Sequence, residues 1–150
     1  MGRGGGALAG GERVMVTALG VDIIEIARLR RALARHPRLK ERLFTSGERA
    51  YCDRRADPAS HYAARFAAKE AIAKAVGRHL RWQEVEVVAD FGGRPSFQLY
   101  GESAQRAGVP RGVSFLLSLS HSWDYAVAAV VMLALPPSFP EDDPYRRVIV

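Results

Sequence analysis

The chain has 150 residues, of which 48% are hydrophobic and 25% are charged, as in an ordinary globular domain. A formal net charge of +6 at pH 7 predicts an acidic partner, which could be nucleic acid, an anionic membrane, a phosphorylated small molecule or an acidic protein. One cysteine excludes an internal disulfide, and no apolar run reaches the roughly 18–20 residues that cross a bilayer. Because the start carries no hydrophobic signal segment, we expect a cytoplasmic protein that is not inserted in a membrane.

The first third of the chain predicts a strand followed by helices. Residues 1–14 are rich in glycine and lack periodicity, which predicts a disordered extension. The β-rich apolar run VMVTALGVD then ends at Asp22. The next segment, IIEIARLRRALARH, has apolar residues at helical spacing and a basic stripe opposite them, and Pro37 ends it. SGERAYCDR predicts a second, short helix with Ser46 as its N-cap.

The later elements are a long helix, a hairpin and two apolar strands. The helix begins near residues 58–61 and ends at Gly77. WQEVEVVAD and SFQLY predict a β-hairpin around the turn FGGRP, and ESAQRAG predicts a short helix. VSFLLSLS and YAVAAVVMLAL predict two strands joined by HSWD. This order predicts an α+β fold, an antiparallel sheet packed with helices, over residues 15–135, with an irregular tail over 136–150.

Three positions carry chemistry that their surroundings do not explain at once. Glu70 lies in the alanine-rich helix RFAAKEAIAKAVG, where it could form a surface pair with Lys74, worth about 0.2–0.5 kcal/mol. Asp22 follows an apolar strand and could cap the next helix in a capping box with Glu25. His121 lies between two apolar strands and could be an ordinary turn residue. Each of these structural alternatives is sufficient for its residue taken alone.

Taken together, the three positions fit a metal and phosphate site. Two carboxylates, Asp22 and Glu70, suit a hard cation such as Mg²⁺, which completes its shell with water and substrate phosphate oxygens. The lysines of the helix and His121 would then hold phosphate charge. Sequence spacing does not establish that the two carboxylates meet in space.

Three motifs resemble those of one enzyme family. GVDIIEIARL, RFAAKEAIAKAVG and SLSHSWDYAVA occur in the order and spacing of the holo-acyl-carrier-protein synthases, which are small 4'-phosphopantetheinyl transferases. The GGRP turn is similar to the family's Gly-Lys-Pro element, with Arg94 in the lysine position. The resemblance runs from about Met15 to Leu133, and Gly77–Arg78–His79 replaces the Gly-Thr-Gly that often follows the long helix in the family.

The resemblance implies a reaction and a set of site residues. The reaction transfers the 4'-phosphopantetheine of coenzyme A to a serine of apo acyl carrier protein and requires Mg²⁺, and the family works as a homotrimer with active sites between subunits. The implied metal ligands are Asp22 and Glu70, with Lys74 near the transferred phosphate. Glu70 or a metal-bound water could take the serine proton. The other implied contacts to coenzyme A are Arg65, Lys69, Arg94, Pro95 and His121, and the contacts to the carrier protein are Arg28, Arg31 and Arg35.

A basic nucleic-acid-binding module is the alternative from another functional class. Between Asp22 and Arg42, seven lysine and arginine residues outnumber three acidic ones, which is enough for a patch that follows a phosphate backbone. The chain has no recognisable nucleic-acid motif, and this alternative leaves Asp22, Glu70 and His121 unexplained. We therefore expect no nucleic-acid partner. The sequence does not distinguish a fatty acid carrier from a polyketide carrier.

Overall fold

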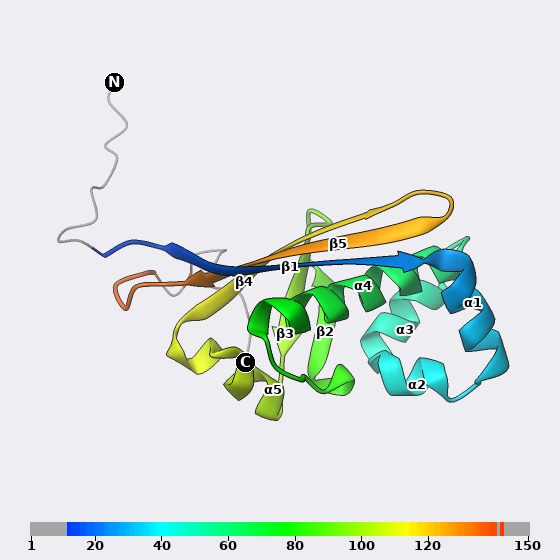
Figure 1. Ribbon diagram of the computed structural model, residues 1–150, viewed down its shortest axis with the longest axis horizontal. Coiled ribbons are helices and arrows are strands. Elements are labelled where there is room, and N and C mark those ends of the chain that lie inside the picture. The colour runs from blue at the N-terminus through cyan, green and yellow to red at the C-terminus, as the bar shows by residue number, and fades with distance from the viewer. Residues whose placement is uncertain (1–11, 141, 143–150) are drawn as a thin grey trace, which may run out of the picture.

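Helices and two antiparallel sheets share the chain in mixed order (Figure 1). The computed structural model describes residues 12–140 and 142. The strands are β1 (Met15–Glu25), β2 (Val85–Ala89), β3 (Pro95–Leu99), β4 (Val113–His121) and β5 (Tyr125–Ala134). The helices are α1 (Ile26–Arg35), α2 (Leu39–Leu43), α3 (Ser46–Asp53), α4 (Pro58–Val76) and α5 (Gly101–Ala107), with short 3₁₀ turns at Trp82–Glu84 and Val109–Arg111. The α+β class is confirmed, while residues 1–11 of the expected extension and 141 and 143–150 of the expected tail lie outside the described residues.

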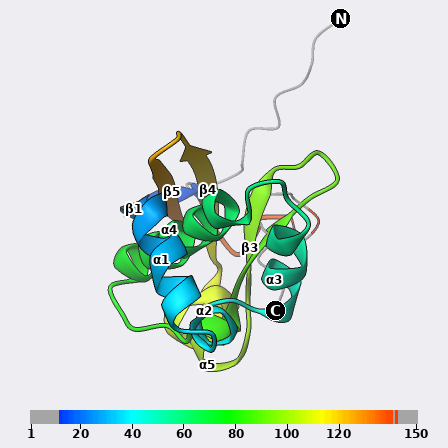
Figure 2. The same cartoon turned by 90° about the vertical axis from the view of Figure 1, so that its right-hand side faces the viewer.

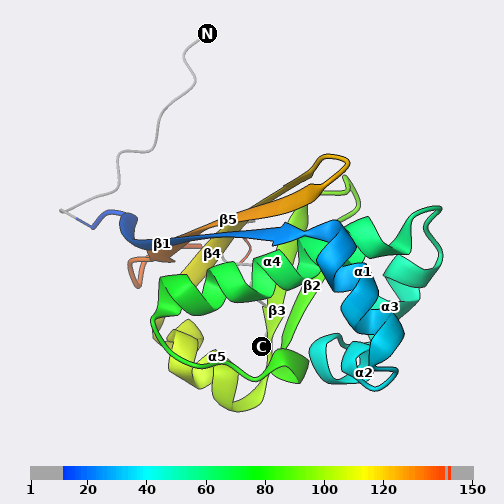
Figure 3. The same ribbon diagram turned by 45° about the vertical axis from the view of Figure 1, so that its right-hand side comes forward.

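The larger sheet has the order β1-β5-β4, and α4 lies along one of its faces (Figures 1 and 3). Along β1 the side chains alternate, so that Gly20, Asp22 and Ile24 are more buried than their neighbours Leu19, Val21 and Ile23. A strand places successive side chains on opposite faces, and the less exposed set is therefore the one that α4 covers. Asp22 belongs to this covered set.

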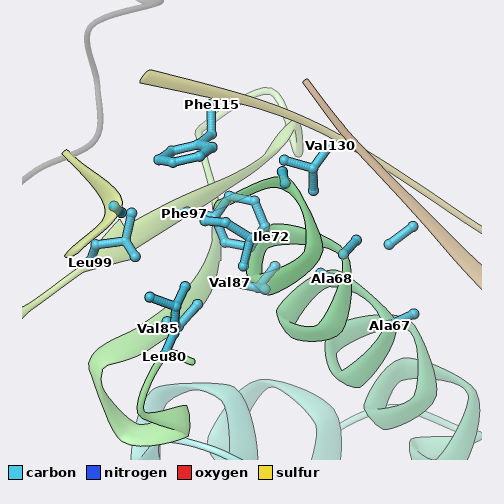
Figure 4. Packing of buried hydrophobic residues seen from close by; sticks show 14 of the residues in the cluster. Ala67, Ala68, Ile72, Leu80, Val85, Val87, Phe97, Leu99, Phe115 and Val130 are labelled. Atoms are coloured by element: carbon cyan, nitrogen blue, oxygen red, sulfur yellow. The ribbon is translucent and has the colours of Figure 1, made fainter. Parts of the chain in front are cut away.

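The main hydrophobic core lies between α4, the larger sheet and the β2–β3 hairpin. Figure 4 shows Ile72 of α4 packed among Phe97, Val87 and Val130, with the alanines of α4 facing the same cluster. Alanine lets a helix approach a sheet closely, because no long side chain separates the two backbones. Helix α4 is rich in alanine because several elements pack closely around it.

Helix α4 begins and ends as the sequence predicts. Pro58 occupies its first turn, and Gly77 follows its last turn with φ of 70°, a left-handed conformation that glycine adopts without steric cost. Arg78 and His79 then continue on the exposed surface. The backbone carbonyl of His79 accepts a hydrogen bond from Arg106 at 3.0 Å.

Two local predictions were wrong. β1 does not end at Asp22, because Ile23 and Ile24 continue to pair with β5 as far as Glu25. Thr45, and not Ser46, caps α3: its hydroxyl accepts from the Glu48 N–H at 3.2 Å, and the Glu48 carboxylate accepts from the Thr45 N–H at 2.9 Å. The short helix α2 was not anticipated from the sequence.

Candidate active site

The covered face of β1 and one side of α4 bring three ionisable residues together. Glu70 and Lys74 are four residues apart on α4 and therefore lie on the same side of the helix. The Lys74 ammonium group lies 2.7 Å from Asp22 Oδ1 and donates to the carbonyl of Val21 at 3.1 Å. Asp22 therefore pairs across to α4, and it does not cap α1, whose N-cap is Glu25 with no side-chain hydrogen bond.

The Asp22 carboxylate is close enough to Glu70 to act on its pKa. Burial raises the pKa of Glu70, the negative charge of Asp22 raises it further, and the positive charge of Lys74 opposes both effects. The second oxygen of Asp22, Oδ2, is buried and has no hydrogen-bond partner. A buried carboxylate oxygen without a partner is costly unless a cation or donor satisfies it.

This donor set fits a hard divalent cation. Carboxylate oxygens are the ligands that Mg²⁺ takes in proteins, usually one or two per ion. The described residues hold no group of three or more His, Cys, Asp or Glu side chains placed to bind a metal. Asp22 and Glu70 would therefore share the ion with water and substrate oxygens.

Gly20 allows α4 to approach this part of β1. A Cβ atom built on Gly20 would lie 1.9 Å from the backbone oxygen of Ala71 and 2.9 Å from the backbone nitrogen of Ala75. No side chain fits there, and Gly20 thus sets the spacing between Asp22 on β1 and Glu70 on α4. Sequence reasoning missed this residue, although a glycine inside a strand is a known sign of close backbone approach.

A cluster of cationic and aromatic side chains lies near the first turns of α4. The Tyr51 ring has the guanidinium carbons of Arg65 and Arg55 at 3.8 Å and 4.1 Å from its centroid. The ring of His61 lies 5.9 Å from Tyr51 and 5.7 Å from His121. Burial lowers the pKa of His61, and the charges of Arg65, His121 and Arg55 lower it further.

The cluster lacks a counter-charge at its most buried member. Arg65 is only 5% exposed, its Nε is buried without a partner, and it forms no ion pair among the described residues. A buried guanidinium is stable when an anion neutralises it. The cluster therefore has the chemistry of a phosphate site, built from the expected residues Arg65 and His121 and from three residues that the sequence did not indicate, Tyr51, Arg55 and His61.

Lys69, which was expected to contact coenzyme A, lies in the protein interior and forms an ion pair there. Its side chain is fully buried and lies 2.7 Å from the Glu48 carboxylate, which is also fully buried. Its ammonium group also donates to the carbonyls of Leu43 at 2.8 Å and Trp82 at 2.7 Å. A lysine has three N–H donors, and these three partners use them all. Lys69 is thus a structural tie between α4, α3 and the segments beside them.

Burial acts on the two members of this pair in opposite directions. It raises the pKa of Glu48 and lowers the pKa of Lys69, while their mutual attraction opposes both shifts. Glu48 also accepts from the backbone N–H groups of Thr45 and Val87 at 2.9 Å and 2.8 Å. With these hydrogen bonds the buried charges are satisfied, as buried ion pairs require.

The arginines expected to bind a carrier protein lie on the exposed side of α1. Arg28, Arg31 and Arg35 are all exposed, and Arg31 makes a 3.7 Å ion pair with Glu25. Arg28 also borders a groove of about 400 Å³ between α1, α2 and α4. Its apolar lining includes Ile23, Leu29, Leu39, Leu43 and Phe66. The charged residues of the lining are Arg28 and Glu25, so an acidic partner that presents apolar side chains would meet Arg28 at the edge of the groove.

The turn with Arg94 and Pro95 lies apart from the carboxylates. Asp90 Oδ1 accepts from the backbone N–H groups of Gly92 and Arg94, both at 2.9 Å, and this fixes the turn. Figure 2 shows the β2–β3 hairpin on the opposite side of the molecule from β1. Among the described residues, the structure shows no hydrogen bond or ion pair between this turn and Asp22.

The outer face of the larger sheet is apolar and uncovered. Leu19, Val21 and Ile23 are 68%, 51% and 59% exposed, and Leu116 of β4 and Tyr125 of β5 add to the exposed apolar surface of the same sheet. In the part of the chain that the structure describes, no helix is long and apolar enough to cross a membrane. Large exposed apolar patches commonly mark protein interfaces.

Comparison with known proteins gives a consistent set of relatives. The sequence profile of the 4'-phosphopantetheinyl transferase superfamily matches residues 18–128. A holo-[acyl-carrier-protein] synthase of Geobacter metallireducens is 46% identical over 123 residues, which is 79% of this chain and 98% of that protein. One of Moorella thermoacetica is 46% identical over 116 residues, 75% of this chain and 91% of that protein.

Solved structures of similar proteins contain coenzyme A. A complex of the synthase of Chronobacterium ammoniagenes with coenzyme A has a TM-score of 0.70 and 33% identity, covering 83% of this chain and 99% of that one. A Bacillus anthracis holo-(acyl-carrier-protein) synthase in complex with CoA (3',5'-ADP) has a TM-score of 0.67 and 32% identity, covering 80% of this chain and 98% of that one. The matched region contains Asp22, Glu70, Lys74 and His121.

Proposed function

Because the chain belongs to the 4'-phosphopantetheinyl transferase superfamily, we propose that it transfers the 4'-phosphopantetheine group of coenzyme A to a serine of apo acyl carrier protein. The other product is 3',5'-bisphosphoadenosine. One observation carries the proposal at the level of residues: Asp22, Glu70 and Lys74 converge from β1 and α4 into one cluster. The nucleophile belongs to the carrier protein, so the enzyme has to position the serine and neutralise developing charge.

Asp22 and Glu70 would hold the Mg²⁺. The unpartnered Oδ2 of Asp22 and the raised pKa of Glu70 support this assignment, since both are expected where a cation is to be bound. When bound, Mg²⁺ supplies a Lewis acid for the phosphate oxygens. Lys74 holds Asp22 in place through Oδ1, and its half-exposed side chain leaves it able to contact a phosphate of the substrate. The candidate acceptors of the serine proton are Glu70 and a metal-bound water.

The cationic cluster would bind the nucleotide end of coenzyme A. Arg65 and His121 are the expected contacts; Arg55 adds positive charge beside them, and His61 adds a ring N–H donor. The cluster has no carboxylate on Arg65 among the described residues, which supports an anionic ligand there. We expect its main contact to be with a phosphate of the 3',5'-bisphosphoadenosine portion.

The carrier protein would dock on α1. Its acidic surface would face Arg28, Arg31 and Arg35, and apolar side chains would enter the groove beside Arg28. Charges on the rim of an interface mainly accelerate and orient association, while the apolar groove contributes most of the affinity.

The working form would be a homotrimer that associates through the outer face of the larger sheet. The exposed Leu19, Val21 and Ile23 support self-association, because they would otherwise remain in water. In such an assembly the Arg94–Pro95 turn of one copy would reach the carboxylates of a neighbouring copy. This would explain why the turn makes no hydrogen bond with Asp22 of its own chain. A cytoplasmic location stays a prediction.

The proposal is tested by incubating the protein with apo carrier protein, coenzyme A and Mg²⁺ and measuring the intact mass of the carrier. The carrier should gain the mass of one phosphopantetheine group. The gain should be absent with excess EDTA, and it should be absent when the acceptor serine of the carrier is replaced by alanine. An unchanged carrier mass in the complete mixture, with fatty acid and polyketide carriers alike, would contradict the proposed function.

A further inference from the structure

Trp123 is an exposed aromatic side chain two residues after His121. It lies in the turn between β4 and β5, at the end of the sheet nearest α1 (Figure 1), and it is 97% exposed. Tryptophan is highly buried in most proteins, because its large apolar surface is unfavourable in water. The chain contains two tryptophans, and the other, Trp82, is only partly exposed and packs against Phe66 and His79.

Hydrogen bonds fix the backbone of the turn that carries Trp123. The Ser122 N–H donates to the Tyr125 carbonyl at 2.8 Å, and the Ser122 hydroxyl accepts from the Asp124 and Tyr125 N–H groups at 3.4 Å and 3.3 Å. The Asp124 carbonyl in turn accepts from the first N–H of α1, that of Ile26, at 2.8 Å. The exposed indole is therefore carried on a fixed backbone, which lowers the entropy cost of using it as a binding surface.

The position of Trp123 relative to His121 suggests its ligand. The two residues are two positions apart, so their Cα atoms are separated by at most about 7 Å. His121 and its neighbour His61 belong to the cationic cluster that would bind a phosphate of the bisphosphoadenosine group. In that group the adenine ring and the 3'-phosphate are attached to the same ribose, so a phosphate at His121 brings the adenine within reach of the next turn residues.

We propose that Trp123 stacks on the adenine ring of coenzyme A and favours substrates that carry the nucleotide. This inference rests on the proposed function. An indole is suited to the task because every base presents a π-face to an aromatic side chain, and one such stack is worth about 5- to 150-fold in affinity. An exposed ring stacks on one side only, so Trp123→Ala should raise the KM for coenzyme A about 5- to 10-fold.

Fluorescence of a chain with Trp123 as its only tryptophan gives a direct readout. In Trp82→Phe, titration with 3',5'-bisphosphoadenosine should quench the emission, and pantetheine, which has no nucleotide, should leave it unchanged. The carbonyl of residue 82 that Lys69 binds is part of the backbone and is retained in this variant. Trp123→Phe, whose remaining tryptophan is Trp82, is the matched control, and its tryptophan emission should not respond to the nucleotide.

The kinetic variants supply a second readout in the otherwise unaltered chain. Trp123→Phe should keep part of the affinity for coenzyme A that Trp123→Ala loses, and neither should change the KM for the carrier protein. Nucleotide binding that is seen by calorimetry without quenching of Trp123 would overturn the inference and leave the proposed function intact. A rise in the carrier KM alone, or quenching by the carrier or by self-association alone, would also overturn it. Absence of any nucleotide binding would contradict both.

Discussion

Lys69 and Lys74 belong to the same helix, but their ammonium groups differ in burial and therefore in role. The side chain of Lys69 is fully buried against Glu48, whereas that of Lys74 is 54% exposed beside Asp22. Removing one partner of a fully buried ion pair leaves an uncompensated charge, and the cost is smaller where one partner is open to water, as Lys74 is. The two residues therefore provide a matched pair for separating stability from catalysis.

Lys69→Met should lower the free energy of unfolding by about 3–5 kcal/mol, because Glu48 would be left buried without its partner. Lys74→Met should lower the same quantity by less than Lys69→Met does, because Lys74 is 54% exposed although Asp22 is only 13% exposed, and it should strongly reduce phosphopantetheine transfer. Urea unfolding and the carrier mass assay measure the two effects. Adding Glu48→Gln to Lys69→Met should recover part of the stability, because glutamine removes the buried charge and keeps one oxygen that accepts from the Thr45 or Val87 N–H. A Lys69→Met protein of normal stability with weakened coenzyme A binding would return Lys69 to the substrate site.

The sequence identified the charged residues of α4 but not the partner of each. Glu70 and Lys74 were interpreted as part of a metal and phosphate site, and their convergence with Asp22 follows from the pleat of β1 and the period of α4. The role of Lys69 depends on Glu48 in α3, and no local pattern links those two positions. Tyr51 and His61 were missed for the same reason, since their contacts to Arg65 and His121 are made only in the folded chain.

At the level of elements, the close contact of β1 with α4 sets the geometry of the site. Gly20→Ala would place a Cβ atom 1.9 Å from the Ala71 carbonyl oxygen, and both positions are fixed by backbone. We expect a loss of at least about 1–3 kcal/mol in the free energy of unfolding, the usual cost of overpacking, with a loss of transfer activity as Asp22 moves away from Glu70. Urea unfolding and the carrier mass assay check both effects.

Gly92→Ala is the control for this prediction. A Cβ there would have its nearest neighbour at 3.4 Å, the side chain of Asp90, and the position needs no left-handed backbone. Its free energy of unfolding should stay within about 0.5 kcal/mol of the unaltered protein, as for most surface substitutions. If Gly20→Ala were equally harmless, the spacing between β1 and α4 would not depend on this glycine.

Helix α1 should determine carrier recognition. Arg28→Glu places a negative charge at the rim of the groove, so the KM for an acidic carrier should rise at least about tenfold at low salt, while the KM for coenzyme A should barely change. Steady-state kinetics at two salt concentrations measure this, since added salt should reduce the difference between the proteins. Unchanged carrier kinetics, together with loss of a physiologically strong DNA or RNA affinity, would instead favour the nucleic-acid alternative.

Element boundaries were predictable where capping chemistry or turn residues stand in the sequence. Pro58 and Gly77 mark α4, and the FGGRP turn marks the β2–β3 hairpin. The end of β1 was misplaced because Asp22 resembles a strand terminus, whereas pairing of Ile23 and Ile24 with β5 carries the strand onward. Pairing between distant strands is a tertiary effect that the local pattern does not contain.

For the whole molecule, the uncovered apolar face of the sheet makes a prediction about assembly. Leu19→Asp should prevent trimer formation, because burying an unpaired carboxylate in an apolar interface is strongly unfavourable. Sedimentation should show a smaller species than the unaltered protein, and transfer activity should fall if sites are shared between copies. Gln105→Glu, an acidic substitution at an exposed position on α5, should keep the assembly.

A chain that begins at Met15 should keep both assembly and activity, and full activity from a monomer would contradict the shared site.

The central claim is that the Asp22–Glu70 pair holds the metal for phosphopantetheine transfer. Glu70→Gln should not destabilise the protein at neutral pH. The raised pKa of Glu70 means that folding disfavours the ionised carboxylate, so this charge lowers the free energy of unfolding at pH values above the folded-state pKa. Glutamine removes the charge and therefore this cost. Asp22→Asn is expected to stay folded as well, and far-UV circular dichroism of both variants provides the folding control.

The most direct measurement is the intact mass of the carrier protein after incubation with coenzyme A and each variant, over a titration of Mg²⁺. Removing either ligand should lower the transfer rate by at least about 10²–10³-fold, the loss seen when one preorganised charge-stabilising group is removed from an active site. Saturating Mg²⁺ should not restore the transfer rate, because a water molecule that fills the empty coordination position does not supply the negative charge of the carboxylate. Near-normal conversion of the carrier by a folded Asp22→Asn or Glu70→Gln protein would remove that carboxylate from the metal site.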